Sequence, residues 1–217
     1  MDRPEQILEV WFADVVQQPE HLTARFGYWF GSDEDTVDSI KARDEWLQHR
    51  FLHDVELASN GQLEAWVHTP RGRLALILLI DQFRRNIFRG TAHAFSHDRQ
   101  ALDLAVAGLR LGVDEKLAPA ERIFFYMPLQ HSESLHIQDE SVKLYERLAQ
   151  AGDDTTKPVL NDVLRYVRMH RDIIQQFGRF PHRNRILGRT STPPELAFLS
   201  KSANDFHHPE APPWRRP

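Results

Sequence analysis

The feature that most constrains the fold of this chain is an uninterrupted apolar run, LALILLI, at positions 74–80. Leu and Ala outnumber β-branched residues in it, and no alternation of polar and apolar residues flanks it, so a buried strand is disfavoured. Thr69 and Pro70 precede it as a helix cap followed by proline at the first helical position. A helix that is apolar on every side is buried, so we predict that this segment is the central helix of the core.

Apolar residues recur at helical spacing along almost the whole chain. Pro4 opens a first helix, FGYWFGS at 26–32 interrupts the pattern, and Ser32 is predicted to cap a second helix with Asp35 as its capping-box partner. Further helices are expected over residues 62–67, 70–83, 97–111, 119–135, 138–149, 158–177 and 193–200. The joints between them are short, which favours antiparallel neighbours. We therefore predict an all-α fold of eight or nine helices in antiparallel pairs.

The length and the C-terminal composition set the expected domain boundaries. A chain of 217 residues is long enough for one domain with a substantial core, and we predict that residues 1–206 form a single compact domain. The last stretch, HHPEAPPWRRP at 207–217, is rich in proline and is predicted to be a disordered tail.

Composition excludes several classes of partner and chemistry. The net charge of −4 provides no overall attraction to nucleic acid or to an anionic membrane surface, so neither is expected as a partner. The chain has no cysteine, which rules out thiol nucleophiles, disulfides and thiolate metal sites. The N-terminus, MDRPEQILEVWFADVV, carries acidic residues within its apolar pattern and does not look like a signal peptide. No apolar run approaches the roughly 20 residues that span a bilayer. A soluble cytoplasmic protein is expected.

One phrase occurs twice, each time after a helix that ends in Gln-Phe. The copies are DQFRRNIFRGT at 81–91 and GRFPHRNRILGRT at 178–190. In the structural interpretation, Arg and Asn side chains bond the free carbonyls of a helix end, and Gly90 and Gly188 allow the turn that follows. The repetition could then reflect an old internal duplication of helical units.

In the functional interpretation, both copies project polar side chains into one shared groove. Guanidinium groups suit carboxylates and phosphates, so the groove would bind a small anionic molecule or the carboxylate of a peptide. The predicted ligand-binding residues are Arg85, Asn86, Arg89, Arg179, His182, Arg183 and Asn184. The two interpretations are compatible.

Four other polar residues are candidates for catalysis. Asp81 ends the most apolar helix and lies four residues before Arg85 on the same helical face, so a part-buried Asp81–Arg85 pair is expected. His131 and Glu133 follow the apolar segment at 119–130, and His170 lies on an apolar helical stripe. A lone histidine on such a stripe is more often a satisfied core residue than a ligand.

No cofactor motif is evident: the chain has neither a glycine-rich phosphate loop nor a nucleophile elbow. The one cofactor that remains under consideration is a divalent metal. His131, Glu133, His170 and His182 would form a nitrogen and oxygen ligand set if the fold brought them together. Their spacing matches no diagnostic metal motif.

Several long phrases occur in the order known from one bacterial family. ILEVWF, YWFG, TPRGRLALILLIDQF, RRNIFRGT, HSE, HRDIIQQFGRFPHRNRILGR and PELAFL together resemble the domain of unknown function 924, from about Ile7 to about Phe206. The resemblance implies an all-helical fold of the tetratricopeptide-like superfamily and implies no activity. The chain departs from the pattern at Arg84, where a proline is expected by analogy with Phe180-Pro181.

Three functions are consistent with these observations. The favoured hypothesis is a helical domain that binds a small anion or a peptide carboxylate in an Arg/Asn/His-lined groove. The alternative is an enzyme, metal-dependent or not, in which His131 or His170 acts as a general base and Glu133 or Asp81 orients it. In the third, the polar phrases only hold helix ends together and the surface acts through protein partners.

Overall fold

Helices account for all the regular secondary structure that the computed structural model describes, in residues 2–32 and 35–201, and no strand occurs there. The α-helices are α1 (Arg3–Phe12), α2 (Leu22–Phe30), α3 (Val37–Ser59), α4 (Pro70–Ile77), α5 (Arg84–Ile87), α6 (Asp98–Arg110), α7 (Pro119–Gln130), α8 (Leu135–Ala151), α9 (Lys157–Phe177) and α10 (Pro193–Leu199). Short 3₁₀ helices are η1 (Pro19–His21), η2 (Glu64–His68), η4 (Ala92–Phe95), η5 (Asp114–Lys116) and η6 (Pro181–Arg183), and η3 (Leu78–Phe83) is a π-helix. The predicted all-α fold is confirmed.

The apolar run forms the buried centre of the molecule, as predicted. Thr69 caps α4 by accepting a hydrogen bond from the Gly72 N–H, and Pro70 occupies the first turn. Every residue from Leu74 to Ile80 is at most 3% exposed. The helical segment runs on from α4 through η3 to α5 without a break. The prediction did not include its π-helical middle section.

Several helix boundaries were predicted wrongly. The central helical segment continues past Phe83 to Ile87, and the helix predicted over 119–135 ends at Gln130. The stretch at 26–32 does not interrupt helical structure, because most of it belongs to α2. The following helix is capped by Thr36 in a capping box with Ser39, so the predicted cap at Ser32 is wrong. Aromatic packing explains why residues 26–30 are helical. The rings of Trp29 and Phe30 pack against Phe124 in the core, and α2 ends before Gly31.

Aromatic rings join the N-terminal helices to the central ones. Phe124 of α7 is fully buried and contacts Trp11 and Phe12 of α1. The same ring contacts Trp29 and Phe30 of α2, at centroid distances of 4.6 and 6.0 Å. Such ring pairs add to the free energy of area burial. Phe124 is thus the point at which α1, α2 and α7 meet.

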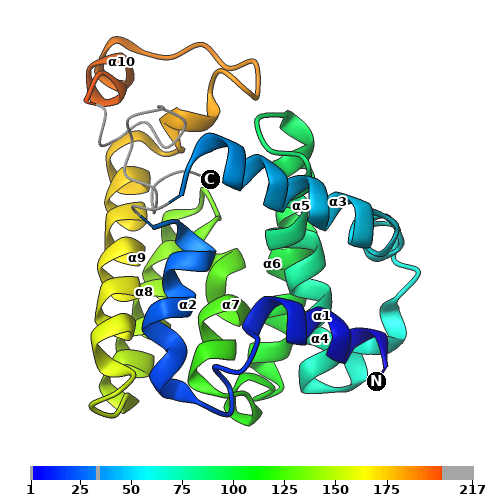
Figure 1. The fold of residues 1–217 in the computed structure, drawn as a ribbon. Coiled ribbons are helices and arrows are strands. Elements are labelled where there is room, and N and C mark those ends of the chain that lie inside the picture. Colours follow the sequence, from blue (N-terminus) through cyan, green and yellow to red (C-terminus); the bar gives the residue numbers. More distant parts are fainter. Residues whose placement is uncertain (1, 33–34, 202–217) are drawn as a thin grey trace.

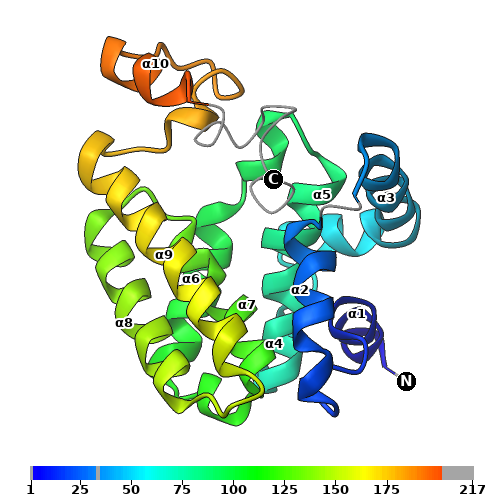
Figure 2. The same cartoon turned by 60° about the vertical axis from the view of Figure 1, so that its left-hand side comes forward.

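The C-terminal half contains an antiparallel helix pair. α8 and α9 run side by side, joined by residues 152–156, and α10 lies beyond the C-terminal end of α9 (Figures 1 and 2). The Phe177 and Phe198 rings, 5.0 Å apart, join α9 to α10. The helices form a single compact domain, and the tetratricopeptide-like arrangement stays a prediction. The predicted tail, 207–217, lies outside the described residues. No helix in the described ranges combines the length and apolarity needed to cross a membrane.

The substitution Phe124→Ala should lower the free energy of unfolding by about 3–5 kcal/mol, because it leaves a cavity where three helices meet. Chemical denaturation followed by circular dichroism measures this loss. Leu111→Ala is the matched control, since Leu111 is 70% exposed and its truncation should change stability by less than about 0.5 kcal/mol. Equal losses in the two variants would contradict the role assigned to Phe124.

Candidate functional site

The two copies of the repeated phrase meet at a carboxylate of the protein itself. Arg85 from the first copy contacts Asp98 Oδ1 at 2.9 Å, and Arg183 from the second contacts Asp98 Oδ2 at 3.2 Å. Asp98 is the first residue of α6, where the helix dipole also favours negative charge. The fold therefore brings Arg85 and Arg183 together, as the groove hypothesis requires. The anion between them is Asp98, which the sequence prediction did not include.

Asp81 is the buried centre of the adjoining charge network. It lies in η3 and is 0% exposed, and its Oδ1 is 3.3 Å from the Arg85 guanidinium, which confirms the predicted pair. Oδ1 also lies 2.7 Å from His131 Nδ1, and the Gln82 amide donates to Oδ2. Burial alone would raise the pKa of Asp81, but the charge of Arg85 and the hydrogen bonds from His131 and Gln82 lower it well below its usual range. Asp81 is thus a carboxylate at any ordinary pH.

His131 is held by Asp81 in one orientation at the C-terminal end of α7. Burial and the charge of Arg85 lower the pKa of His131, so its ring is neutral at physiological pH. A neutral ring that donates from Nδ1 to a carboxylate carries its lone pair on Nε2. The arrangement can supply a base or a hydrogen-bond acceptor.

A cavity of about 340 Å³ opens beside this network. It is lined by Ala92, Phe95, Ser96, Asp98, Arg99, Leu102, Pro128, His131, Ser132, Glu133, Arg183 and Leu187. Its size suits a small molecule, and its wall combines apolar side chains with a few charged ones, as small-molecule sites do. Candidates from the centre of the chain and from the second phrase thus share one cavity.

Arg183 is the cavity-lining cation with unused hydrogen-bonding capacity. Its side chain is 7% exposed and lies between the rings of Phe95 and Phe180, at 4.8 and 4.4 Å. Its NH1 bonds Asp98, while its buried Nε–H has no partner among the described residues. Burial lowers the pKa of Arg183 to about 10, which still leaves it charged at neutral pH.

Glu133 fixes the rim of the cavity to the second phrase. It accepts two hydrogen bonds from Arg189, at 2.8 and 3.1 Å, and one from the Phe180 N–H at 2.8 Å. Burial would raise the pKa of Glu133, but the bonds from Arg189 and Phe180 lower it below its usual value. Its carboxylate is therefore engaged in holding the turn that carries Arg183.

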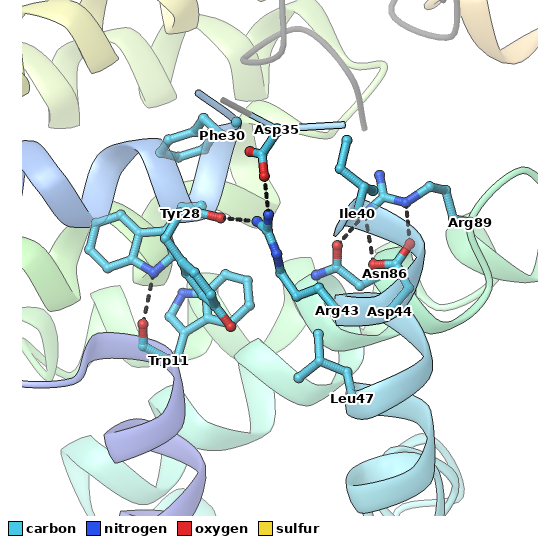
Figure 3. Close-up of a pocket in the computed structure, with 12 residues that line it drawn as sticks. Trp11, Tyr28, Phe30, Asp35, Ile40, Arg43, Asp44, Leu47, Asn86 and Arg89 are labelled. Atoms are coloured by element: carbon cyan, nitrogen blue, oxygen red, sulfur yellow. Dashed lines mark hydrogen bonds and ion pairs between the residues drawn. The ribbon is translucent and has the colours of Figure 1, made fainter. Parts of the chain in front are cut away.

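Asn86 and Arg89 of the first phrase face a different place. Arg89 pairs with Asp44 of α3 at 2.6 Å and donates to Asn86 Oδ1, as Figure 3 shows. Both line a small enclosed space of about 30 Å³ near Trp11 and Tyr28, large enough for little more than one water molecule. The single groove predicted for both phrases is thus divided.

The remaining residues of the second phrase hold local structure. Arg179 pairs with Glu195 of α10 at 2.6 Å, and the fully buried Asn184 donates to Ser191 Oγ. His182 packs against the Phe180 ring. These contacts hold local structure, although none of them is to a free carbonyl of a helix end. Of the predicted ligand-binding residues, Arg183 lines the cavity.

The four metal-ligand candidates have other contacts. The Phe180 ring lies against both His170 and His182, at centroid distances of 5.5 and 5.4 Å. His131 Nδ1 faces Asp81, and Glu133 faces Arg189. Within the described part of the chain, no group of three or more His, Asp or Glu side chains is arranged to hold a metal ion. A metal site stays a prediction from sequence.

Three residues of this site escaped the sequence prediction: Asp98, Arg189 and Phe95. Arg189 lies within the second phrase and could have been included with its neighbours. Asp98 and Phe95 carry no local signal beyond their position at the start of a predicted helix. Only the packing of α6 against the two phrases shows their roles.

His170 should make the stability of the protein depend on pH. Burial holds its pKa at about 3, below the ordinary value of 6.5. The unfolded chain then binds more protons than the folded one between these values, so stability falls as the pH drops from 6.5 towards 3. Asp81 stays ionised near pH 5 because its pKa is lowered, so it adds little to this change.

In His170→Phe, which keeps a ring against Phe180, the loss of unfolding free energy between pH 7 and pH 5 should be about 2 kcal/mol smaller than in the wild type. Urea denaturation at both pH values measures the difference. The wild type at the same pH values is the reference, and any pH-independent effect of the lost Tyr166 contact cancels. Parallel pH profiles would contradict a neutral buried His170.

Comparison with known proteins identifies the family and assigns no activity. The family described as "Bacterial protein of unknown function (DUF924)" matches residues 7–203. The solved structure of a protein of unknown function, ATU0120 from Agrobacterium tumefaciens, is similar with a TM-score of 0.70 and 34% sequence identity, over 88% of this chain and 99% of that one. No curated protein matches. The chain, which carries the Asp81–His131 pair beside its cavity, belongs to the DUF924 family of bacterial proteins.

Proposed function

We propose that the protein binds a small anionic molecule, with a carboxylate or similar group, in the cavity lined by Arg183 and His131. The observation that carries this proposal is the buried Arg183 guanidinium, which lines the cavity and has an Nε–H without a partner among the described residues. A buried charge is costly unless it is fully paired, and Asp98 is shared between two arginines. A ligand carboxylate in the cavity would give Arg183 a second anionic partner.

The rest of the wall indicates the shape of such a ligand. Phe95, Leu102 and Leu187 present apolar surface, so the anion should carry an apolar group. His131 offers a neutral ring, which adds no charge and can accept a hydrogen bond. A cytoplasmic location is part of the proposal, since the chain has no cysteine and relies on no disulfide.

Benzoate is a suitable probe because it joins a carboxylate to a compact apolar ring. Titration calorimetry should show saturable binding to the wild type that weakens as salt rises. Arg183→Gln should weaken binding by about tenfold or more, since a charge-assisted hydrogen bond is lost. Arg183→Lys should fall between the two, because it keeps the charge and loses the planar fork.

Arg168→Gln is the matched control. It removes an arginine from a largely exposed pair with Glu146, outside the cavity lining, and should leave benzoate affinity unchanged. Thermal unfolding of each variant confirms that the chain is folded. Equal affinities of the Arg183→Gln and Arg168→Gln variants, or no binding by the folded wild type, would overturn the proposal.

A second candidate function, general-base catalysis on the bound anion, is favoured by the 2.7 Å contact between Asp81 and His131. A carboxylate that orients a neutral histidine at a cavity is the usual arrangement for removing a proton from an attacking water. For an ester substrate, His131 Nε2 would take the proton as the water oxygen bonds to the carbonyl carbon. The ester C–O bond then breaks, and the leaving oxygen receives the proton.

Mono-4-nitrophenyl succinate, which bears a carboxylate, is the probe for this activity. His131→Gln should lower kcat by about a hundredfold or more, and Arg168→Gln should not change it. Burial lowers the pKa of His131 below 6.5, the ordinary value for histidine. The ring therefore stays neutral at pH 6.5, and the rate should decline only at lower pH, where the ring becomes protonated. Release of nitrophenol measures the rate. Equal turnover by wild type and His131→Gln would exclude His131 as the base.

A further inference from the structure

A second cavity, which shares only Ser96 and Arg99 with the lining of the one beside His131, lies between α4, η2 and α6. Its volume is about 540 Å³. Most of its wall is apolar and comes from Ala58, Leu63, Val67, Leu76, Ile80, Leu104 and Ala107. The polar side chains in the lining include Arg73 and Gln100. A cavity of this kind, apolar with a few polar groups, is typical of a small-molecule site.

Arg73 is a buried cation that no acidic side chain neutralises. It is 6% exposed, and no ion pair joins it to an acid among residues 2–32 and 35–201. Its NH1 donates to the Leu104 carbonyl at 3.0 Å, and its NH2 donates to the Val67 carbonyl at 3.2 Å. Burial lowers the pKa of Arg73, and no carboxylate opposes that effect. A guanidinium has five N–H groups, so the described residues accept hydrogen bonds from fewer than half of them.

The neighbouring helix is shaped to admit this side chain. A Cβ at Gly108 of α6 would lie 2.8 Å from Arg73 Cδ and 2.5 Å from the Phe125 ring, closer than real Cβ atoms approach. Gly108 therefore lets Arg73 reach the cavity wall. A smaller neutral side chain could also donate hydrogen bonds to the carbonyls of the neighbouring helices. A buried arginine without a counter-ion, in contrast, destabilises the fold unless an anion pairs with it.

The lining also contains two carboxylates, Glu64 and Asp103, and neither forms an ion pair with Arg73 among the described residues. Arg84, also 6% exposed, donates to Ser96 Oγ at 2.9 Å, and Ser96 lines the cavity. Asp103 in the lining is already paired with Arg99. The buried Oε1 of Gln100 has no partner within the described part of the chain. The cavity thus offers, within largely apolar walls, a cation that no carboxylate of the described residues neutralises.

We infer that this second cavity binds an amphiphilic anion, with its carboxylate at Arg73 and its aliphatic chain along the apolar wall. The cation supplies the attraction for the head group, and the wall supplies about 25 cal/mol for each Å² of apolar ligand surface removed from water. This site is independent of the proposed function, because Arg183 and His131 are not in its lining.

Octanoate is the probe, and titration calorimetry on the full chain is the measurement. Wild type should bind octanoate saturably, about tenfold or more tighter than either octanol, which lacks the charge, or acetate, which lacks the chain. Arg73→Gln should weaken octanoate binding about tenfold. Arg110→Gln, on an exposed position of α6 outside this cavity, is the charge-matched control and should not change it.

A second variant keeps the inference testable if Arg73→Gln does not fold. Ala107→Phe places a large side chain at the exposed edge of the cavity and leaves Arg73 intact, so it should also weaken octanoate binding. Arg183→Gln should leave octanoate affinity unchanged while it lowers benzoate affinity. The inference is overturned if octanol binds as tightly as octanoate, if folded wild type shows no saturable binding, or if Ala107→Phe has no effect.

Discussion

The rest of the site depends on the burial of one carboxylate, Asp81, within the most apolar helical segment of the chain. A buried charge must be compensated, and the compensation comes from Arg85 one turn later and from His131 at the end of α7. Arg85 also contacts Asp98 at the start of α6, and Asp98 in turn contacts Arg183. The arrangement around the buried carboxylate therefore includes α6 and the second phrase. Four segments far apart in sequence are thus held in one arrangement by the ion pairs of Arg85 and Arg183 and by the hydrogen bond of His131 to Asp81.

The π-helix at η3 places this carboxylate within a continuous helix. Residues Leu78–Phe83 form the wider turn, and π turns within α-helices often occur at functional sites. The buried segment is otherwise apolar and packed, so the polar side of the turn contains mainly Asp81 and its partners. The irregular backbone and the buried charge therefore coincide next to His131, which lines the cavity.

The repeated phrase has two roles. Arg179, Asn184 and Arg89 secure neighbouring elements, whereas Arg85 and Arg183 converge on Asp98. Both Arg85 and Arg183 belong to helix exits, where side chains are free to reach across to another helix. Repetition in the sequence thus reflects similar backbone chemistry, and the shared anion is a consequence of how the two exits pack. A ligand carboxylate at Arg183 would add a further negative charge to the series Arg85, Asp98 and Arg183.

The sequence by itself determined the helices, the central buried segment, several caps and the Asp81–Arg85 pair, because each depends on residues within a few turns of one another. It also identified His131 and Arg183 as polar residues beside apolar helices. Tertiary structure alone decided that His131 meets Asp81, that Asp98 joins the two phrases, and that Asn86 and Arg89 face elsewhere. It also left Arg73 without a counter-ion among the residues that the structure describes. These relations depend on the packing of helices distant in sequence, and local spacing carries no information about them.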